Sequence, residues 1–317
     1  MAKYISEVLV EAPASSANLG PGFDVLALAL KEPADRLQIN RDDSKRGFFL
    51  QVKSRWTIPT NPMTNAAGAV ARKVARDYSI RSRIRMKLEK RVPIGVGLGS
   101  SAASSVCAAL GMSVCFNLKL TTSEILKYAS DGEEVASGVG HFDNVSASLL
   151  GGVVVVRNLG GIEVSRIETA PLMRLGIAMP ELDLPARKTE FARSLLPARV
   201  RIEDMTRNVS MAASLILGLS SGDVGLVGKG MHDFVVEPAR SKMIPGYEAV
   251  RRAALEAGAS GVCISGAGPS LLAVYHRKKA SGSKILRAMV SAFVGAGVQA
   301  GGFETGVGGG ARIVRTK

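Results

Sequence analysis

The sequence has 317 residues, 46% of them hydrophobic, which is enough for two domains that each bury a core. Its net charge is +14, but the basic residues are scattered and not interleaved with aromatic ones, which argues against a specific nucleic-acid site. The three cysteines (Cys107, Cys115 and Cys263) lie in apolar runs, and no histidine–cysteine cluster has metal-site spacing. Glu7 and Glu11 interrupt the first apolar stretch, so we expect no signal peptide and a cytoplasmic location with reduced thiols.

The first half of the chain mixes predicted strands and helices. Alternating apolar residues at 84, 86 and 88 predict a strand over Arg83–Glu89, and a loop rich in proline and glycine is predicted from Pro13 to Gly22. Thr121 or Thr122 is placed to cap the helix that follows it. The other predicted elements are strands over Tyr4–Glu11, Arg36–Asn40, Phe48–Lys53 and Gly152–Arg157, and helices over Ala66–Tyr78, Ser101–Phe116, Ser123–Ala136 and Asp143–Leu150.

One stretch of this half, from Val92 to Leu118, has no charged residue and is long enough to span a bilayer. It is rich in Gly, Ser and Ala, and it starts with a loop rather than a helix. We therefore interpret it as a buried helix behind a binding loop, and we expect no membrane segment.

The second half begins with a pattern typical of a hairpin, Gly161–Thr169 with Arg174–Met179. Further on, two strands flank a tight turn over Gly266–Pro269, which either contacts a bound phosphate or is a purely structural turn. Strands mixed with helices in this way indicate an α+β fold. The remaining elements are helices over Arg201–Leu217, Val224–Asp233, Tyr247–Glu256 and Ser281–Val294, and strands over Gly261–Ser265, Leu271–Tyr275 and Ala311–Val314.

The most informative segment is Val92–Ser104, with the sequence VPIGVGLGSSAAS. Its glycines let the backbone adopt positive φ angles, so that several N–H groups can point into one concavity at the start of a helix. Such a concavity binds anions, and phosphate is its usual occupant. The segment is not a Walker loop, because no lysine follows its last glycine, and it does not fit the GxGxxG dinucleotide pattern.

Five segments resemble one family, the small-molecule kinases named for galactose, homoserine, mevalonate and phosphomevalonate (GHMP kinases). Ala12–Asp24 (APASSANLGPGFD), Pro93–Ala103 (PIGVGLGSSAA) and Ile264–Ser270 (ISGAGPS) occur in the family's order. The second segment is common to the family, whereas the first is similar to its homoserine-phosphorylating branch. Gly132–Val145 and Glu237–Gly246 are similar to that branch's GE…SG..H.DNV and EPxR…IPG patterns. The resemblance covers nearly the whole chain.

This resemblance implies a two-domain α+β architecture. Residues 1–158 would form a domain like the second domain of ribosomal protein S5, with the glycine and serine loop, and residues 159–317 a ferredoxin-like domain. ATP and Mg²⁺ would bind between them, and the enzyme would convert L-homoserine to O-phospho-L-homoserine in threonine biosynthesis. A homodimer without membrane or specific nucleic-acid partners is expected.

Homoserine offers a carboxylate, an ammonium group and a primary hydroxyl. Because a guanidinium can pair with a carboxylate through two parallel hydrogen bonds, we predict that Arg193 and Arg240 bind the carboxylate. A lone arginine is more often a surface charge, so this assignment rests on the matched motifs. The resemblance assigns Asn18, His141 and Asp143 to the contacts around the ammonium group and Asp24 to the hydroxyl end.

The catalytic residues implied by the resemblance are Asp24, Asn144 and Arg193. Some relatives have a catalytic aspartate near the position of Asn144. The homoserine branch is thought to work without a strong base, which suits a loose phosphoryl-transfer transition state in which positioning and charge stabilisation dominate.

Glu133 is the predicted magnesium ligand, together with Ser101 or Ser100. Its neighbour Glu134 is not expected to take part, because adjacent helical residues face different directions. The nucleotide is expected to contact the loop residues Pro93, Ile94, Gly95, Val96, Gly97, Leu98, Gly99, Ser100, Ser101, Ala102, Ala103 and Ser104, with Asn65, Lys87 and Thr189.

Two alternatives remain open at this point. A kinase of the same family acting on another small alcohol, such as mevalonate or shikimate, would also need arginines for a carboxylate, but Asn18, Asp24 and Asp143 favour a substrate with an ammonium group. A nucleic-acid-binding protein would fit the charge and the S5-like half, but no RNP motif, KH motif or aromatic platform supports it.

Overall fold

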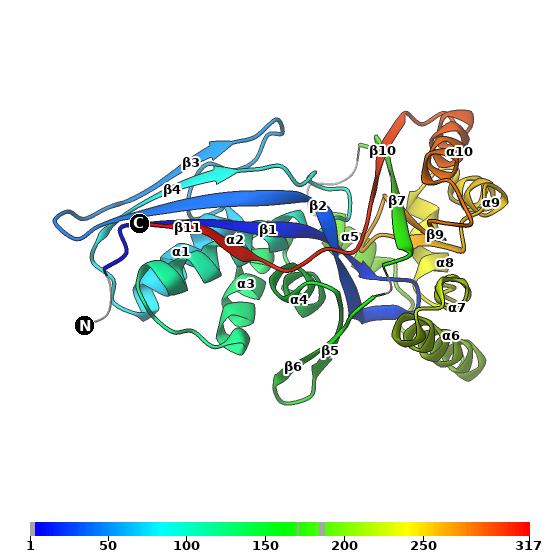
Figure 1. The fold of residues 1–317 in the computed structure, drawn as a ribbon, viewed down its shortest axis with the longest axis horizontal. Helices are drawn as coiled ribbons and strands as arrows, with labels where there is room; N and C mark the ends of the chain where they lie inside the picture. The colour runs from blue at the N-terminus through cyan, green and yellow to red at the C-terminus, as the bar shows by residue number, and fades with distance from the viewer. Residues whose placement is uncertain (1–3, 170, 184–187) are drawn as a thin grey trace.

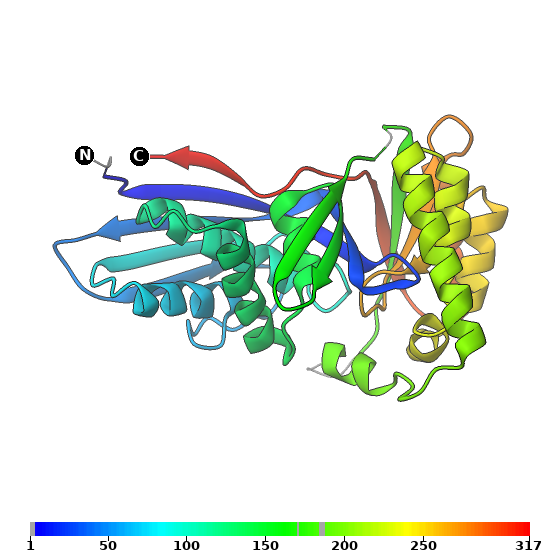
Figure 2. The same cartoon turned by 90° about the horizontal axis from the view of Figure 1, so that it is seen from below.

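Two β-sheets with helices packed on them build the protein. The computed structural model describes residues 4–169, 171–183 and 188–317. Figures 1 and 2 show an elongated molecule, with a long sheet and its helices at one end and a shorter sheet with its own helices at the other. The mixture of sheets and helices confirms the predicted α+β class.

The first sheet has the strand order β11-β1-β2-β4-β3. In addition, β5 pairs with the N-terminal part of β2 and with β6. Alternation places Ile84, Met86 and Leu88 of β4 in the core and the residues between them outside. Its strands are β1 (Glu7–Asn18), β2 (Gly22–Asp42), β3 (Phe48–Lys53), β4 (Arg83–Glu89), β5 (Val153–Asn158), β6 (Ile162–Ile167) and β11 (Arg312–Thr316).

Four helices cover one face of this sheet (Figure 2): α1 (Ala66–Asp77), α2 (Ser100–Cys115), α3 (Thr122–Ser137) and α4 (Phe142–Leu150). Most of α2 is buried, because small residues let it pack against β1, β2, α1 and α3 at once. This burial explains the charge-free stretch from Val92 to Leu118. Among the described residues, no helix is both long and apolar enough to cross a bilayer.

The second sheet is antiparallel, with the order β10-β7-β9-β8. Numbered in chain order within this sheet, the strands run 4-1-3-2, with a hairpin between the second and third, which is the predicted ferredoxin-like arrangement. Its strands are β7 (Met173–Pro180), β8 (Gly261–Ile264), β9 (Leu271–His276) and β10 (Ala300–Thr305).

The helices of this part pack on both faces of its sheet. Helices α9 and α10 share a core with one face of the second sheet, whereas α6 and α7 pack against its other face. The helices are α5 (Lys188–Ser194), α6 (Ile202–Ser221), α7 (Val224–Gly230), α8 (Glu237–Arg240), α9 (Tyr247–Glu256) and α10 (Gly282–Gly295), with a 3-10 turn over Ser241–Met243.

Several predicted elements are wrong in their pairing or extent. The predicted loop from Pro13 to Gly22 is mostly strand, because β1 continues to Asn18 and pairs with β2 along its whole length. The predicted hairpin of Gly161–Thr169 with Arg174–Met179 does not form: β6 pairs with β5, while β7 pairs with β9 and β10. The division between the sheets is therefore not at residues 158 and 159, since β6 and the C-terminal β11 both belong to the first sheet.

Candidate active site

A cavity of about 630 Å³ lies where the two parts of the molecule meet. It is lined by the end of β1 and the start of β2, the glycine loop before α2, α3 and α4, the short helices α5 and α8, and the turn after β8. Most of the predicted site residues line it: Asn18, Asp24, Asn65, Ile94, Gly95, Gly97, Leu98, Gly99, Ser100, Ser101, Ser104, Glu133, His141, Asp143, Asn144, Thr189, Arg193 and Arg240.

Hydrogen bonds join the first three matched segments at this cavity. The Ser15 N–H donates to the Leu98 carbonyl at 3.1 Å, and the Gly266 N–H donates to the Ala17 carbonyl at 3.1 Å. The Ser265 hydroxyl lies 2.8 Å from both the Ser16 hydroxyl and the Gly97 carbonyl. Segments far apart in the sequence thus form one framework around the glycine loop.

The glycine loop has the predicted backbone conformation. Gly95, Gly97 and Gly99 have φ angles of 71°, 82° and 60°, and Gly99 directly precedes α2. The N-cap residue Gly99 has no side chain to cap this helix start, so the first turn of α2 receives no capping hydrogen bond from it. The loop and the helix start together form a site suited to an anion.

Gly97 tolerates no side chain, because a Cβ atom there would lie 2.2 Å from the Ser265 carbonyl oxygen. At Gly95 nothing lies within 4 Å of such an atom, so Gly95→Ala costs only the positive φ, about 1–2 kcal/mol. We expect Gly97→Ala to lower the midpoint of thermal unfolding of the ligand-free protein clearly more than Gly95→Ala does. Calorimetry of the two variants checks this, and equal losses would show that the loop does not pack against the second part in solution.

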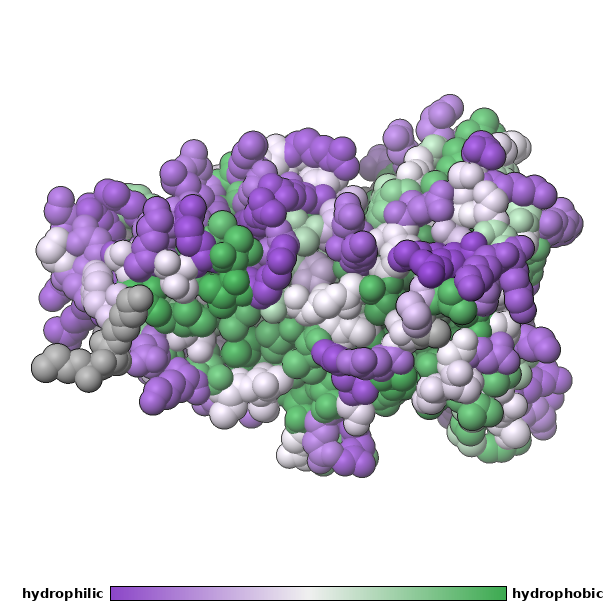
Figure 3. Space-filling view, in the orientation of Figure 1, coloured by the Kyte–Doolittle hydropathy of each residue, from purple (hydrophilic) through white to green (hydrophobic). Residues whose placement is uncertain are grey.

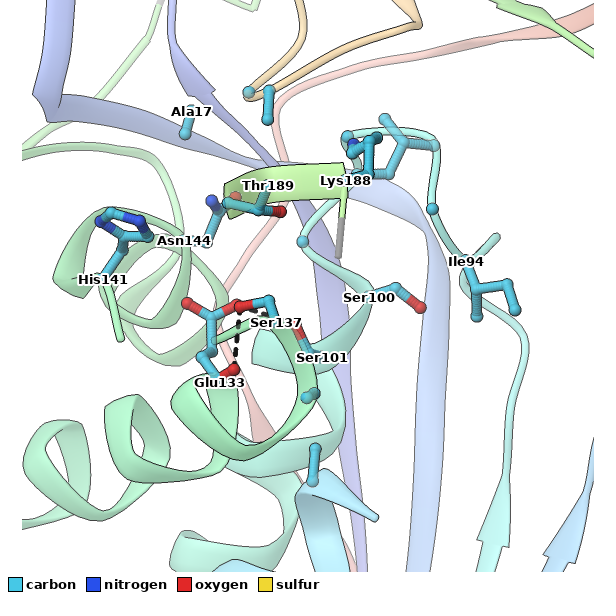
Figure 4. Close-up of a pocket in the computed structure, with 18 of the residues that line it drawn as sticks. Ala17, Ile94, Ser100, Ser101, Glu133, Ser137, His141, Asn144, Lys188 and Thr189 are labelled. Atoms are coloured by element: carbon cyan, nitrogen blue, oxygen red, sulfur yellow. Dashed lines mark hydrogen bonds between the residues drawn. The ribbon is translucent and has the colours of Figure 1, made fainter. Parts of the chain in front are cut away.

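The three serines of the loop have different partners. The Ser100 hydroxyl donates to the Val92 carbonyl at 3.0 Å, and the Ser104 hydroxyl donates to Asp35 at 2.8 Å. Only the Ser101 hydroxyl bonds to a predicted metal ligand, the Glu133 carboxylate, at 2.9 Å (Figure 4). This geometry favours Ser101 over Ser100 as the partner of Glu133.

A buried ion pair beneath the loop was not predicted from the sequence. The Lys90 ammonium donates to the Asp35 carboxylate and to the Ser100 carbonyl, and the N–H groups of Arg91 and Val92 donate to the other Asp35 oxygen, each at 2.9 Å. The pair ties β2 and the end of β4 to the start of α2. Nothing local in the sequence marks it, because Asp35 lies more than fifty residues from Lys90.

Some predicted nucleotide contacts do not reach the cavity. Lys87 is exposed on the outer face of β4, since strand alternation turns it away from the core side that holds its neighbours. Ala102 and Ala103 are buried in the core on α2, and Pro93 and Val96 also lie outside the cavity lining. Asn65 lines the cavity, but its amide caps α1 and bonds to the Pro59 carbonyl.

Two buried carboxylates dominate the electrostatics of the cavity. Burial, reinforced by the negative charge of Asp143, raises the pKa of Glu133 to about 8, although hydrogen bonds from Ser101 and the backbone oppose the shift. Burial likewise raises the pKa of Asp143 to about 6. No basic side chain in the described parts of the chain forms an ion pair with either carboxylate. The negatively charged forms of both carboxylates would therefore be stabilised by a cation that a bound ligand or metal ion brings into the cavity.

The predicted arginine pair lies around Phe23, which the sequence analysis did not single out. The guanidinium groups of Arg240 and Arg193 lie 5.0 and 5.3 Å from the centre of its ring. Arg193 pairs with Asp24 at 2.7 Å and lies 3.3 Å from the His141 ring. Arg240 donates to the Gly266 carbonyl at 3.1 Å, and its Nε, which is buried, has no partner.

The remaining polar residues fix this end of the cavity. The Asn18 amide donates to the Gly266 carbonyl at 2.8 Å, and its oxygen accepts from the Asp24 N–H. The Asn144 oxygen accepts from the Ser15 hydroxyl at 2.8 Å. Burial lowers the pKa of His141, which keeps its ring neutral at pH 7 and able to accept from Arg193.

The family models and the relatives of this chain agree with one another. Residues 65–152 match the GHMP kinases N terminal domain, and residues 213–295 match the GHMP kinases C terminal domain. Homoserine kinase of Thermoplasma volcanium is 41% identical over 92% of both chains. Homoserine kinase of Natronomonas pharaonis is 40% identical over 96% of this chain and 99% of its own.

Solved structures lead to the same family. The crystal structure of homoserine kinase from Cytophaga hutchinsonii matches 99% of both chains with a TM-score of 0.89 and 31% identity. L. major mevalonate kinase, solved in complex with R-mevalonate, shares only the fold, with a TM-score of 0.65 at 14% identity. The chain belongs to the GHMP kinase family and, within it, to the homoserine kinases.

Proposed function

We propose that the protein transfers the γ-phosphoryl group of ATP to the side-chain hydroxyl of L-homoserine, giving O-phospho-L-homoserine and ADP. The observation that carries this proposal is one cavity with a phosphate-binding loop on one side and the arginine pair on another. The choice of L-homoserine as substrate is supported by the relatives named homoserine kinase, which match nearly the whole chain.

At the nucleotide end, the loop N–H groups and the start of α2 would hold the phosphates of ATP. Thr189 of α5 lines the same space. The Lys90–Asp35 pair would keep the loop in place when the nucleotide binds, because it fixes the Ser100 carbonyl and the N–H groups of Arg91 and Val92.

At the substrate end, Arg193 and Arg240 would bind the carboxylate, and the buried Asp143 would accept the ammonium group. The unpartnered Nε of Arg240 and the buried carboxylate of Asp143, which forms no ion pair among the described residues, are what these roles require. Asp24 would then lie near the hydroxyl, held by Arg193 and next to His141.

Phosphoryl transfer at this site would depend on positioning and charge stabilisation. The homoserine hydroxyl oxygen forms a bond to the γ-phosphorus while the bond from that phosphorus to the ADP oxygen breaks, and the hydroxyl proton passes to a phosphoryl oxygen or to water. Asn144 has no basic group, and Asp24 is already paired with Arg193. This arrangement suits a loose transition state, in which the reacting atoms are brought into line and the charge on the phosphoryl oxygens is neutralised.

The residues present also fit a magnesium ion. Magnesium is usually held by one or two carboxylates and by phosphate oxygens, and it keeps several waters. Within the described residues, Glu133 is a buried carboxylate without a basic partner, and the Ser101 hydroxyl lies 2.9 Å from it. We propose that these two side chains hold Mg²⁺, which would neutralise charge on the phosphates when bound.

We also propose that the protein is a homodimer that acts in the cytoplasm. Light scattering of the purified protein tests the mass of the assembly.

The direct test is ADP release by the purified protein with ATP, Mg²⁺ and a panel of small alcohols. We expect L-homoserine to stimulate release far more than mevalonate or shikimate, because only homoserine offers an ammonium group to Asp143. Phosphorus NMR of the product would show a new phosphate monoester. Stimulation no greater with homoserine than with the other alcohols or buffer would contradict the proposed substrate.

A further inference from the structure

Lys188 is a buried lysine of the cavity that the sequence analysis did not single out. It is the first residue of α5, only 8% of it is exposed, and it lines the same cavity as the glycine loop. Its ammonium donates to the Gly268 carbonyl. Within residues 4–169, 171–183 and 188–317, no carboxylate forms an ion pair with it. Burial, reinforced by the charge of Arg240, lowers the pKa of Lys188 to about 7.

A buried ammonium group without an anion is costly, and a neighbouring arginine adds to the cost. The cost is offset if a ligand brings the missing negative charge. An anion is therefore the ligand that this position suits.

The position of the ammonium group identifies which anion. Gly268 belongs to the turn that packs on the middle of the glycine loop, because a Cβ atom on Gly97 would lie 2.8 Å from the Gly268 oxygen. In Figure 4, Lys188 and Thr189 lie on one side of the pocket, with Ser101 and Glu133 on the other. Lys188 thus lies next to the glycine loop through the Gly268 turn, and it faces Ser101 and Glu133 across the pocket from the second part of the molecule.

The other basic side chains that line the cavity are either already paired with a carboxylate or lie at the substrate end. Lys90 is paired with Asp35 beneath the loop, and Arg193 and Arg240 flank Phe23 at the substrate end. The loop itself offers only neutral N–H and O–H groups to a nucleotide with several negative charges. We propose that Lys188 is a further catalytic residue, which binds the γ-phosphoryl group of ATP and stabilises the charge on its oxygens during transfer.

This inference rests on the proposed function, and its test separates the two. The neutral variants Lys188→Met and Lys188→Gln are compared with Lys229→Met, an exposed lysine on α7 outside the cavity. Calorimetric titration measures the Kd of ADP and of the β,γ-methylene analogue of ATP, each with Mg²⁺. This comparison needs no homoserine, so it stands even if another alcohol proves to be the substrate.

Both neutral variants should bind the ATP analogue at least tenfold more weakly than the wild type, while their Kd for ADP changes less than threefold. With the true acceptor alcohol, kcat should fall about a hundredfold. The ligand-free variants should unfold at the same temperature as the wild type or higher, because a buried unpaired charge is removed. Lys229→Met should match the wild type throughout.

Three results would overturn the inference. Equal weakening of ADP and of the ATP analogue would mean that Lys188 does not distinguish the γ-phosphoryl group. A rise confined to the KM for the alcohol would place it at the substrate carboxylate. A lower unfolding temperature with unchanged preference for the triphosphate would make it a structural residue. If Lys188→Met does not fold, the same measurements are made on Lys188→Gln alone. Absence of ADP release with homoserine in the wild type contradicts only the proposed substrate.

Discussion

Glu133→Gln is expected to lower kcat for homoserine phosphorylation by about a hundredfold or more. The variant keeps the size of the side chain and one acceptor oxygen but removes the negative charge that would hold magnesium beside Ser101. Losing one charge-stabilising group at a transferring phosphoryl group typically costs two to three orders of magnitude in kcat. Ser101→Ala should lower kcat in the same direction. Steady-state kinetics over a range of Mg²⁺ concentrations is the measurement, and Glu133→Gln should also need more Mg²⁺ for half-maximal rate.

The neighbouring Glu134 provides the matched control, because it lies on the same helix but is exposed and outside the cavity. Glu134→Gln should leave kcat within about twofold of the wild type. Glu133→Gln should fold normally at pH 7, since burial raises the pKa of Glu133 to about 8 in the ligand-free protein and the amide then replaces a protonated acid. A larger loss of kcat in the Glu134 variant would refute the magnesium assignment.

Removing either guanidinium of the arginine pair is expected to weaken kcat/KM for homoserine by roughly thirty- to a thousandfold, or about 2–4 kcal/mol. Arg240→Ala should have the larger effect, because Arg240 is only 4% exposed whereas the side chain of Arg193 is 39% exposed and shares its charge with Asp24. Lysine should rescue poorly at either position, since it supplies the charge without the two parallel donors.

The KM values for the two substrates decide whether this role is correct. The KM for ATP should change little in either variant, because the two guanidinium groups flank Phe23 and are assigned to the substrate carboxylate. Arg252→Ala, an exposed position on α9, is the control and should behave like the wild type. An increase confined to the KM for ATP would move the arginines to the nucleotide and leave homoserine without a partner for its carboxylate.

Local features of the site could be predicted from the sequence because short segments determine them. The glycine spacing required positive φ angles, and all three glycines have them. The strand over Phe48–Lys53 and the start of α2 within one residue of Ser101 are confirmed, and Thr121, one of two candidate residues, caps α3 together with Glu124. Strand alternation, capping and glycine conformation all act within a few residues.

The matched motifs also identified most residues of the cavity, although not their partners. Asn18, Asp24, His141, Asp143, Arg193 and Arg240 come from five different elements and line one space. Their placement agrees with the prediction that they act together, while the role of each stays a proposal. The motifs did not reveal Phe23 between the two arginines, because a single phenylalanine in a motif carries no signal of what stacks on it.

The sequence by itself determined the family, the phosphate-binding loop and the kind of chemistry, since these depend on residue types at fixed short spacings. Only the tertiary structure decided that β6 and β11 join the first sheet and that Lys87 faces outward while Lys90 lies beneath the loop. It also placed Lys188 in the cavity, where no carboxylate of the described residues forms an ion pair with it. Each of these outcomes depends on contacts between segments distant in the sequence. Pairing and burial at such distances are set by the packing of the whole fold, and no local pattern encodes them.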